Sequence, residues 1–297
     1  MKFRIRAFGI FAALVVLYAF LIAPPLNYPT GMTVQVAQGE SVGAVADNLY
    51  LLGAIQSRPI FKLAVILLGG SVQAGAYLLD KNNTLFLAYR MTRGETGLEQ
   101  VRITIREGMT LREIEKLVGT DLPDDQEGYL FPDTYDFLPG SPADLVVARM
   151  HSRYEEHVAP LRAEIEASGH TEEEIIILAS ILEKEARQPE TMRIVSGILW
   201  DRIKIGMPLQ VDAVFGYINN RPTYHPSGED LEIDSPYNTY KYPGLPPGPI
   251  GNPGMTAIEA ALRPGESPYL YYLTGVDGTM HYAKTFEEHV RNRRFLK

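Results

Sequence analysis

The alternation of hydrophobic and polar positions between residues 32 and 105 predicts a small α+β module. TVQVA, which begins at Thr33, alternates like a strand, and GESVGAVADNLYLLGAI has a helical spacing that ends near Gly53. A second apolar helix is predicted over 59–68, and QAGAYLL returns as a strand after it. VRITI, residues 101–105, alternates again and closes the region. A strand, two helices and a strand within about 50 residues form a compact unit.

Residues 106–297 are predicted to form a larger α+β domain. Three pairs of Thr and Glu have the spacing of a capping box, in which each side chain binds an unpaired amide at a helix start: Thr110–Glu113, Thr171–Glu174 and Thr256–Glu259. They predict helices at about 111–118, 172–187 and 257–263. Two further helices are predicted from periodicity, at 143–167 with a break at Pro160 and at 191–205 with Gly206 as its end.

The segment 236–254, PYNTYKYPGLPPGPIGNPG, is predicted to be an ordered loop. Its six prolines and four glycines exclude regular structure. Its tyrosines, leucine and isoleucine are too apolar for a free linker. Ordered loops of this length usually carry function.

The amino terminus departs from the globular pattern. Lys2, Arg4 and Arg6 precede an uncharged run over 7–23, which Pro24 and Pro25 close. The run reaches the lower end of the roughly 17–25 residues that span a bilayer. We therefore predict a cytoplasmic head (1–6), a single transmembrane helix (7–23) and a linker (24–31), with the rest of the chain outside the membrane. A cleaved signal peptide is the alternative, but no small-residue cleavage site is evident.

Composition narrows the function classes. With 45% hydrophobic and 22% charged residues, the chain is globular rather than disordered. It has no cysteine, which excludes disulfide scaffolds and thiol chemistry. The formal net charge is −8, and the three cations of the head leave −11 on the exported part. An acidic body argues against binding nucleic acid and against broad adhesion to anionic lipid.

The predicted helix ending IIILASILEKEAR, residues 175–187, carries the first candidate for catalysis. Ile175, Leu178, Leu182 and Glu185 share one face at 3.6 residues per turn. A Glu on a buried face has a raised pKa and can donate a proton near neutral pH. Because the run is apolar nearly all round, Glu183 on the opposite side is an alternative, and either Glu could instead form a surface ion pair.

Five segments together resemble the YceG-like family of endolytic murein transglycosylases. They are EGYLFPDTY (127–135), LASILEKEA (178–186), GMPLQVDAVFGY (206–217), SPYNTYKYPGLPPGPIGNPG (235–254) and HYAKTFEEH (281–289). With the predicted anchor, the resemblance covers essentially the whole chain.

The resemblance implies a LysM-like module over 32–105, a catalytic domain over 106–297, and attachment to the inner (plasma) membrane with the catalytic part in the periplasm or its equivalent. It implies cleavage of the MurNAc–GlcNAc bond in nascent peptidoglycan strands, with peptidoglycan synthases as membrane partners. The family's catalytic residue, the second Glu of its E-K-E motif, corresponds to Glu185. One Glu suffices as acid and then base, because the MurNAc 6-hydroxyl replaces water and leaves a 1,6-anhydroMurNAc end.

Other residues in these segments are candidates for substrate binding. They are Gln210, Asp212, Tyr237, Asn238, Tyr240, Asp133, Thr134 and His281. Each has a structural alternative: a turn after a helix for Gln210 and Asp212, a helix cap for Asp133 and Thr134, packing for the loop residues, and hydrogen bonding for His281 and the neighbouring His289.

No cofactor or metal is expected, since the histidines are scattered and lack a metal-binding spacing. Nothing in the sequence marks a Schiff-base lysine with a phosphate cup, so a pyridoxal lyase ranks last. The alternative function is a non-catalytic scaffold that binds peptidoglycan for cell-wall synthases. The short segment 120–126 leaves little room for an inserted helix, which puts the outer wall of the cleft and any preference for strand length in doubt.

Overall fold

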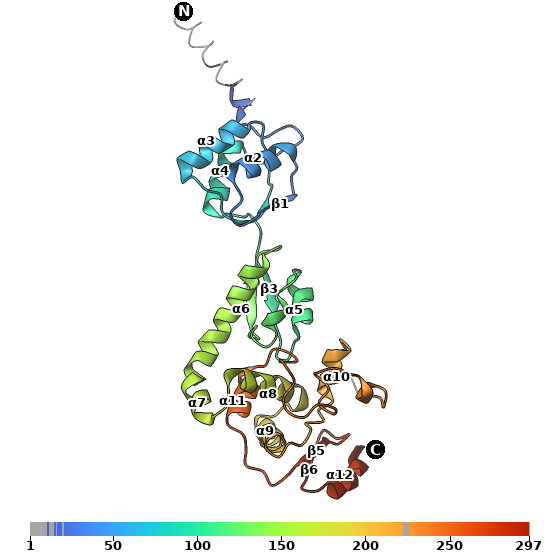
Figure 1. The fold of residues 1–297 in the computed structure, drawn as a ribbon. Coiled ribbons are helices and arrows are strands. Elements are labelled where there is room, and N and C mark those ends of the chain that lie inside the picture. Colours follow the sequence, from blue (N-terminus) through green and yellow to red (C-terminus); the bar gives the residue numbers. More distant parts are fainter. Residues whose placement is uncertain (1–10, 12–14, 16, 20, 222–225, 297) are drawn as a thin grey trace, which may run out of the picture. The chain divides into compact units, whose positions relative to one another are not determined.

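The computed structural model describes residues 11, 15, 17–19, 21–221 and 226–296. The chain divides into two compact units (Figure 1). Unit 1 comprises Met1–Arg102 and Asp136–Pro142, and unit 2 comprises Ile103–Tyr135 and Ala143–Lys297. The division falls within two paired strands, β3 (Val101–Thr104) and β4 (Thr134–Phe137). The predicted domains, 32–105 and 106–297, stay a prediction.

Between residues 24 and 100, unit 1 is an antiparallel strand pair with three helices. β1 (Thr33–Val36) pairs with β2 (Gly75–Leu78), so that Thr33 lies opposite Leu78. Two predicted helices are present, α2 (Val42–Leu51) and α3 (Arg58–Leu68), each begun by a serine whose hydroxyl accepts from a main-chain amide. Alternate residues of β1 and the inner faces of the helices form one core.

A third helix, α4 (Thr84–Arg93), was not predicted. The Asn83 side chain accepts a hydrogen bond from Phe86 N at 2.8 Å and caps its start, and Gly94 ends it in the left-handed conformation. Its buried residues Leu87, Ala88 and Met91 share one face, but the exposed Leu85 and Phe86 in the sequence TLFLAYRMTR obscure this stripe.

About half of the predicted membrane anchor, residues 7–23, lies outside the described residues. Within the part of the chain that the structure describes, no helix combines the length and hydropathy needed to span a bilayer.

Unit 2 is mainly helical. Its elements are α5 (Leu111–Val118), α6 (Ala143–Val158), α7 (Arg162–Ser168), α8 (Glu172–Glu185), α9 (Pro189–Lys204), α10 (Ala213–Ile218), α11 (Met255–Leu262), the antiparallel pair β5 (Tyr271–Thr274) and β6 (Met280–Ala283), and α12 (Phe286–Asn292). A 3-10 turn over Ala159–Leu161 separates α6 from α7, which confirms the break predicted at Pro160. Helices with small antiparallel strand pairs make the fold α+β.

Two of the three predicted capping boxes are present and one prediction was wrong. Thr110 and Glu113 begin α5, and Thr171 and Glu174 begin α8, each with both reciprocal bonds. By contrast, α11 begins at Met255 with no side-chain cap from Thr256. Gly254 N instead donates to the Glu183 carboxylate at 3.0 Å, so a residue distant in the sequence satisfies this helix start.

Helix α8 forms the centre of unit 2. Every residue from Ile175 to Leu182 is buried, and α11 packs along it. The Ser180 hydroxyl accepts from Ile250 N at 3.0 Å, which fixes the proline-rich loop to the helix. The predicted loop 236–254 is therefore ordered and partly buried, and contains no regular element.

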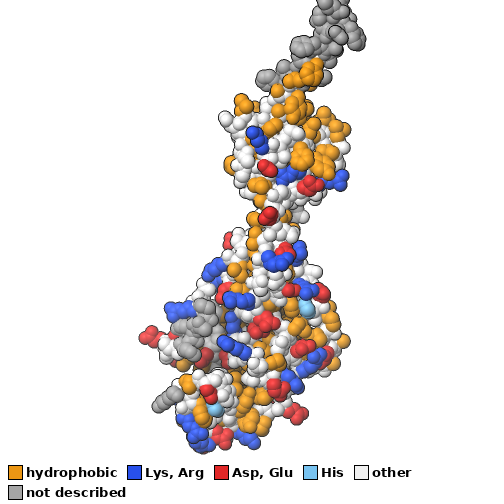
Figure 2. Space-filling model, turned by 180° about the vertical axis from the view of Figure 1, so that it is seen from behind, with side chains coloured by type: hydrophobic (Ala, Val, Ile, Leu, Met, Phe, Trp, Pro, Cys, Tyr) orange, Lys and Arg blue, Asp and Glu red, His pale blue; other side chains and the backbone are white. Residues whose placement is uncertain are grey.

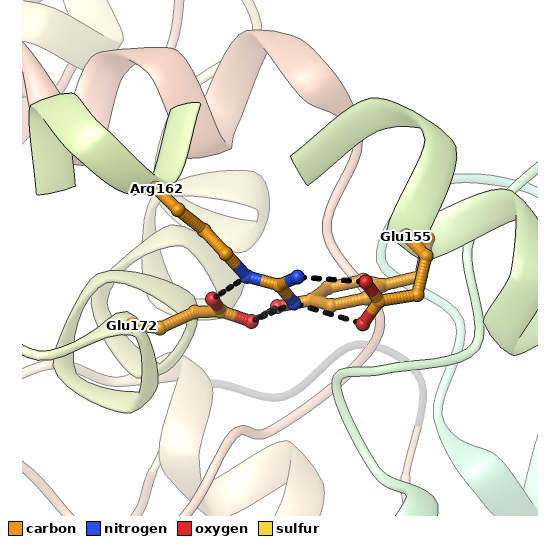
Figure 3. Close-up of polar contacts among 4 residues, drawn as sticks. Glu155, Arg162 and Glu172 are labelled. Atoms are coloured by element: carbon orange, nitrogen blue, oxygen red, sulfur yellow. Dashed lines mark hydrogen bonds and ion pairs between the residues drawn. The ribbon is translucent and has the colours of Figure 1, made fainter. Parts of the chain in front are cut away.

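Arg162, the first residue of α7, links α6 to α8. Its guanidinium donates to both oxygens of Glu155 on α6 and to Glu172, the first residue of α8 (Figure 3). Tyr154 adds a 2.8 Å hydrogen bond to Glu172. Because these charged side chains are partly exposed, their ion pairs add little to the free energy of unfolding. We take their main role to be fixing the orientation of the helices.

Candidate active site

A cleft of about 1240 Å³ opens in unit 2 at the carboxyl end of α8. Its walls come from α5, α9, α10, β5, α12 and the proline-rich loop. Glu185, the last residue of α8, lines the cleft. The buried helix thus carries one carboxyl group out of the core and into a solvent-accessible hollow.

The Glu185 carboxyl is held by groups from three other segments. The Tyr272 hydroxyl on β5 donates to Oε2 at 3.1 Å, and the main-chain amide of Ala213 also donates to it. Arg202 and Asp212 lie close enough to act electrostatically. Arg202 Nε donates to Leu270 O at 2.7 Å and its Nη1 donates to Leu209 O, so this cation ties together the segments that carry Tyr272 and Asp212.

These surroundings raise the pKa of Glu185 to about 7. Burial is the main cause, since it penalises the charged form, and the negative charge of Asp212 acts in the same direction. The bonds from Tyr272 and Ala213 and the charge of Arg202 oppose the rise. A carboxyl with this pKa is close to half protonated at neutral pH, as a general acid and base requires.

Three of the residues predicted for substrate binding lie in the cleft wall beside this carboxyl. Asp212 accepts a 2.6 Å hydrogen bond from the Tyr240 hydroxyl, and both line the cleft. Gln210 also lines it, with a positive φ of 50° that is uncommon for a residue other than glycine. Gln210 N donates to Thr239 O at 3.1 Å, so the turn at 210–212 is attached to the proline-rich loop.

The other two loop candidates differ from each other. Tyr237 lines the cleft, and its ring centroid lies 5.0 Å from that of Tyr217. Asn238 is fully buried, and its amide donates to Leu231 O and Ile233 O while its oxygen accepts from Tyr240 N. Asn238 therefore shapes the loop, and its geometry does not support direct contact with substrate.

The remaining three candidates lie outside the cleft lining. A bond from Thr134 N lowers the pKa of the Asp133 carboxyl, and so does its 2.6 Å ion pair with Arg153. Thr134 is exposed and shares a hydrogen bond with Thr104. The His281 ring stacks on Phe295 at 3.8 Å. These contacts differ from the structural alternatives considered for the three residues: Asp133 and Thr134 lie at the start of strand β4 and cap no helix, and the buried Nε2 of His281 has no hydrogen-bond partner among the described residues.

Sequence reasoning missed several residues of the cleft. Tyr272, Arg202 and Tyr271 line it, as does His289, whereas His281 was the one selected. Burial lowers the pKa of His289. Tyr272 lies 87 positions from Glu185, and no local pattern pairs a tyrosine with a glutamate over that separation.

A second carboxyl of raised pKa, Glu127, was also missed, although EGYLFPDTY was singled out as a motif. Glu127 is buried and lines the same cleft. Leu111 N donates to both of its oxygens at 3.0 Å, and Asn252 Nδ2 donates to Oε1 at 3.0 Å. Burial raises the pKa of Glu127 to about 7 despite these bonds.

Among the described residues, no group of three or more His, Cys, Asp or Glu side chains is placed to hold a metal ion. The expectation that the reaction needs no metal or cofactor stays a prediction.

Comparisons with known proteins identify the family of the chain. The profile of the YceG-like family matches residues 34–295. A protein of Bacillus subtilis (strain 168) named endolytic murein transglycosylase is 32% identical over 317 aligned positions, which cover 91% of this chain and 88% of that protein. A protein of the same name from Streptococcus pneumoniae serotype 2 is 27% identical, and the match covers 88% of this chain and 57% of that longer protein. The crystal structure of a yceG-like protein from Listeria monocytogenes superposes with a TM-score of 0.59 at 29% identity, covering 88% of this chain and 98% of that one.

Proposed function

Since the chain belongs to the YceG-like family, we propose that its cleft binds nascent peptidoglycan and cuts the glycan strand internally, with Glu185 as the only acid and base. The coarser class, a peptidoglycan lytic transglycosylase, follows from the curated relatives. The observation that carries the finer proposal is the Glu185 carboxyl, set in the cleft with a pKa of about 7.

In the proposed reaction, protonated Glu185 gives its proton to the oxygen that joins MurNAc to GlcNAc. As that bond breaks, C1 of MurNAc gains positive charge, which the nearby Asp212 carboxylate can stabilise. The Glu185 carboxylate then removes the proton from the MurNAc 6-hydroxyl, whose oxygen attacks C1. The products are a 1,6-anhydroMurNAc end and a new GlcNAc end, and no water is consumed.

The neighbours of Glu185 suit both steps. Tyr272 and the Ala213 amide donate to its oxygens and stabilise the carboxylate that forms after the first transfer. Asp212 favours the protonated form needed before it. The aromatic rings of Tyr237 and Tyr240 offer apolar faces in the cleft wall on which sugar rings can pack.

The cellular setting is part of the same proposal. Residues 7–23 would anchor the chain in the inner (plasma) membrane with the amino terminus in the cytoplasm, and the cleft would act on strands outside it. The module at 32–105 would be LysM-like, and peptidoglycan synthases would be the membrane partners.

Product analysis tests the proposal. The full chain in detergent is incubated with uncrosslinked glycan strands, and the products are weighed by mass spectrometry. We expect new 1,6-anhydroMurNAc ends with the wild type and with Asp133→Asn, a carboxyl change outside the cleft, and none with Glu185→Gln. Anhydro products from Glu185→Gln at the wild-type rate would remove Glu185 from the mechanism. Strand binding by the wild type without new ends would favour the scaffold alternative.

A further inference from the structure

Helix α3 exposes large apolar side chains as well as burying them. Its inner face consists of Phe61, Ala64 and Val65. On its outer face, Ile66 and Leu67 are 65% and 77% exposed, and Leu63 and Leu68 are also exposed. A helix that is apolar on both faces is expected inside a core or in contact with lipid, and α3 has a core on one face only.

Helix α4 packs against α3 and extends this feature. Its exposed residues include Leu85, Phe86 and Tyr89, and the Phe86 and Tyr89 rings stack with centroids 6.2 Å apart. Figure 2 shows hydrophobic side chains exposed over much of unit 1. Unit 1 therefore carries an apolar surface that its own fold does not cover.

Both helices begin where the proposed anchor ends. The Gln56 side-chain amide, just before α3, donates to Ala19 O and Ala23 O at 3.0 Å each. Thr84 N, the first residue of α4, donates to Ile22 O at 2.9 Å. Residues 19–23 form the last part of the proposed transmembrane segment. If that segment spans the bilayer, the starts of α3 and α4 lie at the membrane surface.

The charges of this region suit lipid headgroups. Neither α3 nor α4 contains Asp or Glu. The exposed Arg93 guanidinium lies 5.6 Å from the centre of the Tyr89 ring, and an aromatic ring beside a cation is typical of a membrane interface. Outside the three cations of the proposed cytoplasmic head, residues 24–102 hold six Lys and Arg against five Asp and Glu, whereas residues 103–297 hold nineteen against thirty-one. The acidity that argues against lipid contact thus belongs to the later part of the chain.

We propose that the exposed apolar side chains of α3 and α4 enter the boundary between headgroups and acyl chains of the bilayer that holds the anchor. Unit 1 then rests on the membrane and is held there by two contacts, the anchor and this surface. The inference rests on the proposed anchor, and it makes unit 1 a lipid-binding element. Of the possible partners, lipid is favoured because it necessarily surrounds the point at which both helices start.

The chain has no cysteine, so single-cysteine probes can test this directly. The full chain carrying Leu67→Cys is labelled with an environment-sensitive fluorophore and reconstituted into vesicles of phosphatidylethanolamine and phosphatidylglycerol. We expect blue-shifted emission and strong quenching by lipids that carry a nitroxide high on the acyl chain. The matched control is Gln38→Cys, an exposed position in the turn between β1 and α2, which should keep its emission in water and resist the same quencher.

The outcomes separate the two proposals. If the labelled protein does not float with the vesicles, the anchor proposal fails and this inference fails with it. If the protein floats but the L67C probe emits as in water and is not quenched, the anchor stands and the membrane contact of α3 is overturned. Equal quenching of the L67C and Q38C probes would also overturn it, because the contact would then not be specific to the α3 and α4 surface.

Discussion

Replacing Glu185 with Gln should stabilise the protein at high pH and leave its stability unchanged at low pH. The folded chain raises the pKa of Glu185 from 4.5 to about 7. Below pH 4.5 the carboxyl is protonated in both states, so the favourable contribution of the neutral, buried group is fully present. As the pH rises towards 7, the unfolded chain loses this proton first, and that contribution is lost.

The pKa values set the size of the effect. The rise corresponds to about 3 kcal/mol at pH values above 7, since each pKa unit equals about 1.4 kcal/mol. Because Glu185 keeps some exposure to the cleft, we expect about 1–3 kcal/mol. Gln is neutral at every pH and can still accept the Tyr272 bond, so Glu185→Gln should show no such loss.

Urea unfolding at pH 4 and pH 8.5 measures this difference. Trp200, the only tryptophan, lies on α9 in unit 2 and donates to Ala261 O, so its fluorescence reports the unit that holds Glu185. Asp133→Asn provides a control of opposite sign. The pKa of Asp133 is lowered by Thr134 N and Arg153, so its contribution is present above its ordinary pKa, and the variant should lose stability at pH 8.5. Equal free energies of unfolding for wild type and Glu185→Gln at pH 8.5 would refute the raised pKa of Glu185.

Three further predictions concern the neighbouring groups. Tyr272→Phe removes a hydrogen bond to the Glu185 carboxylate worth about 1.5–3 kcal/mol, so the high-pH limb of the rate of anhydro-end formation should move up by roughly 1–2 pH units. Asp212→Asn removes the negative charge that raises the Glu185 pKa, so the same limb should move down in a pH–rate profile. Glu127→Ala leaves buried donors of Leu111 and Asn252 unpaired and should lower the free energy of unfolding at pH 5 by about 1–3 kcal/mol, while mass spectrometry still detects anhydro ends.

The parts of the fold that local rules determine were predictable. The capping box at Thr171 and the apolar run after it place α8, but the 3.6-residue period leaves Glu183 and Glu185 both open, because every residue from Ile175 to Leu182 is buried. The start of α11 was mispredicted because the amide of its N-cap residue, Gly254 N, is satisfied by Glu183, a contact between distant segments. Helix α4 was missed because exposed residues such as Phe86 obscure its amphipathic pattern. Hydrophobic periodicity identifies a helix by assuming that its exposed residues are polar. A helix whose exposed residues contact lipid does not meet this assumption.

Local sequence rules also predict the candidate site only in part. The sequence nominates Glu185, Asp212 and Tyr240 from motifs, but the hydrogen bond between Asp212 and Tyr240 joins two separate loops. Asn238 and Tyr237 are neighbours in the chain, yet one is fully buried and the other lines the cleft. Which polar side chain of an ordered loop turns inward depends on main-chain acceptors elsewhere, and a sequence does not contain their positions.

Two carboxyls of similar pKa in one cleft, Glu185 and Glu127, also fit the inventory of a hydrolase, which needs an acid and a second carboxylate. Their surroundings separate them. Both oxygens of Glu127 accept from Leu111 N, and one also accepts from Asn252, so this buried group joins the start of α5 to the proline-rich loop. Glu185 accepts from the Tyr272 hydroxyl and the Ala213 amide, but it is more exposed than Glu127 and lies close to Asp212 in the cleft wall. One reactive carboxyl beside a structural one fits an intramolecular attack by the sugar better than an attack by water, and the ratio of anhydro to reducing ends among the products measures this directly.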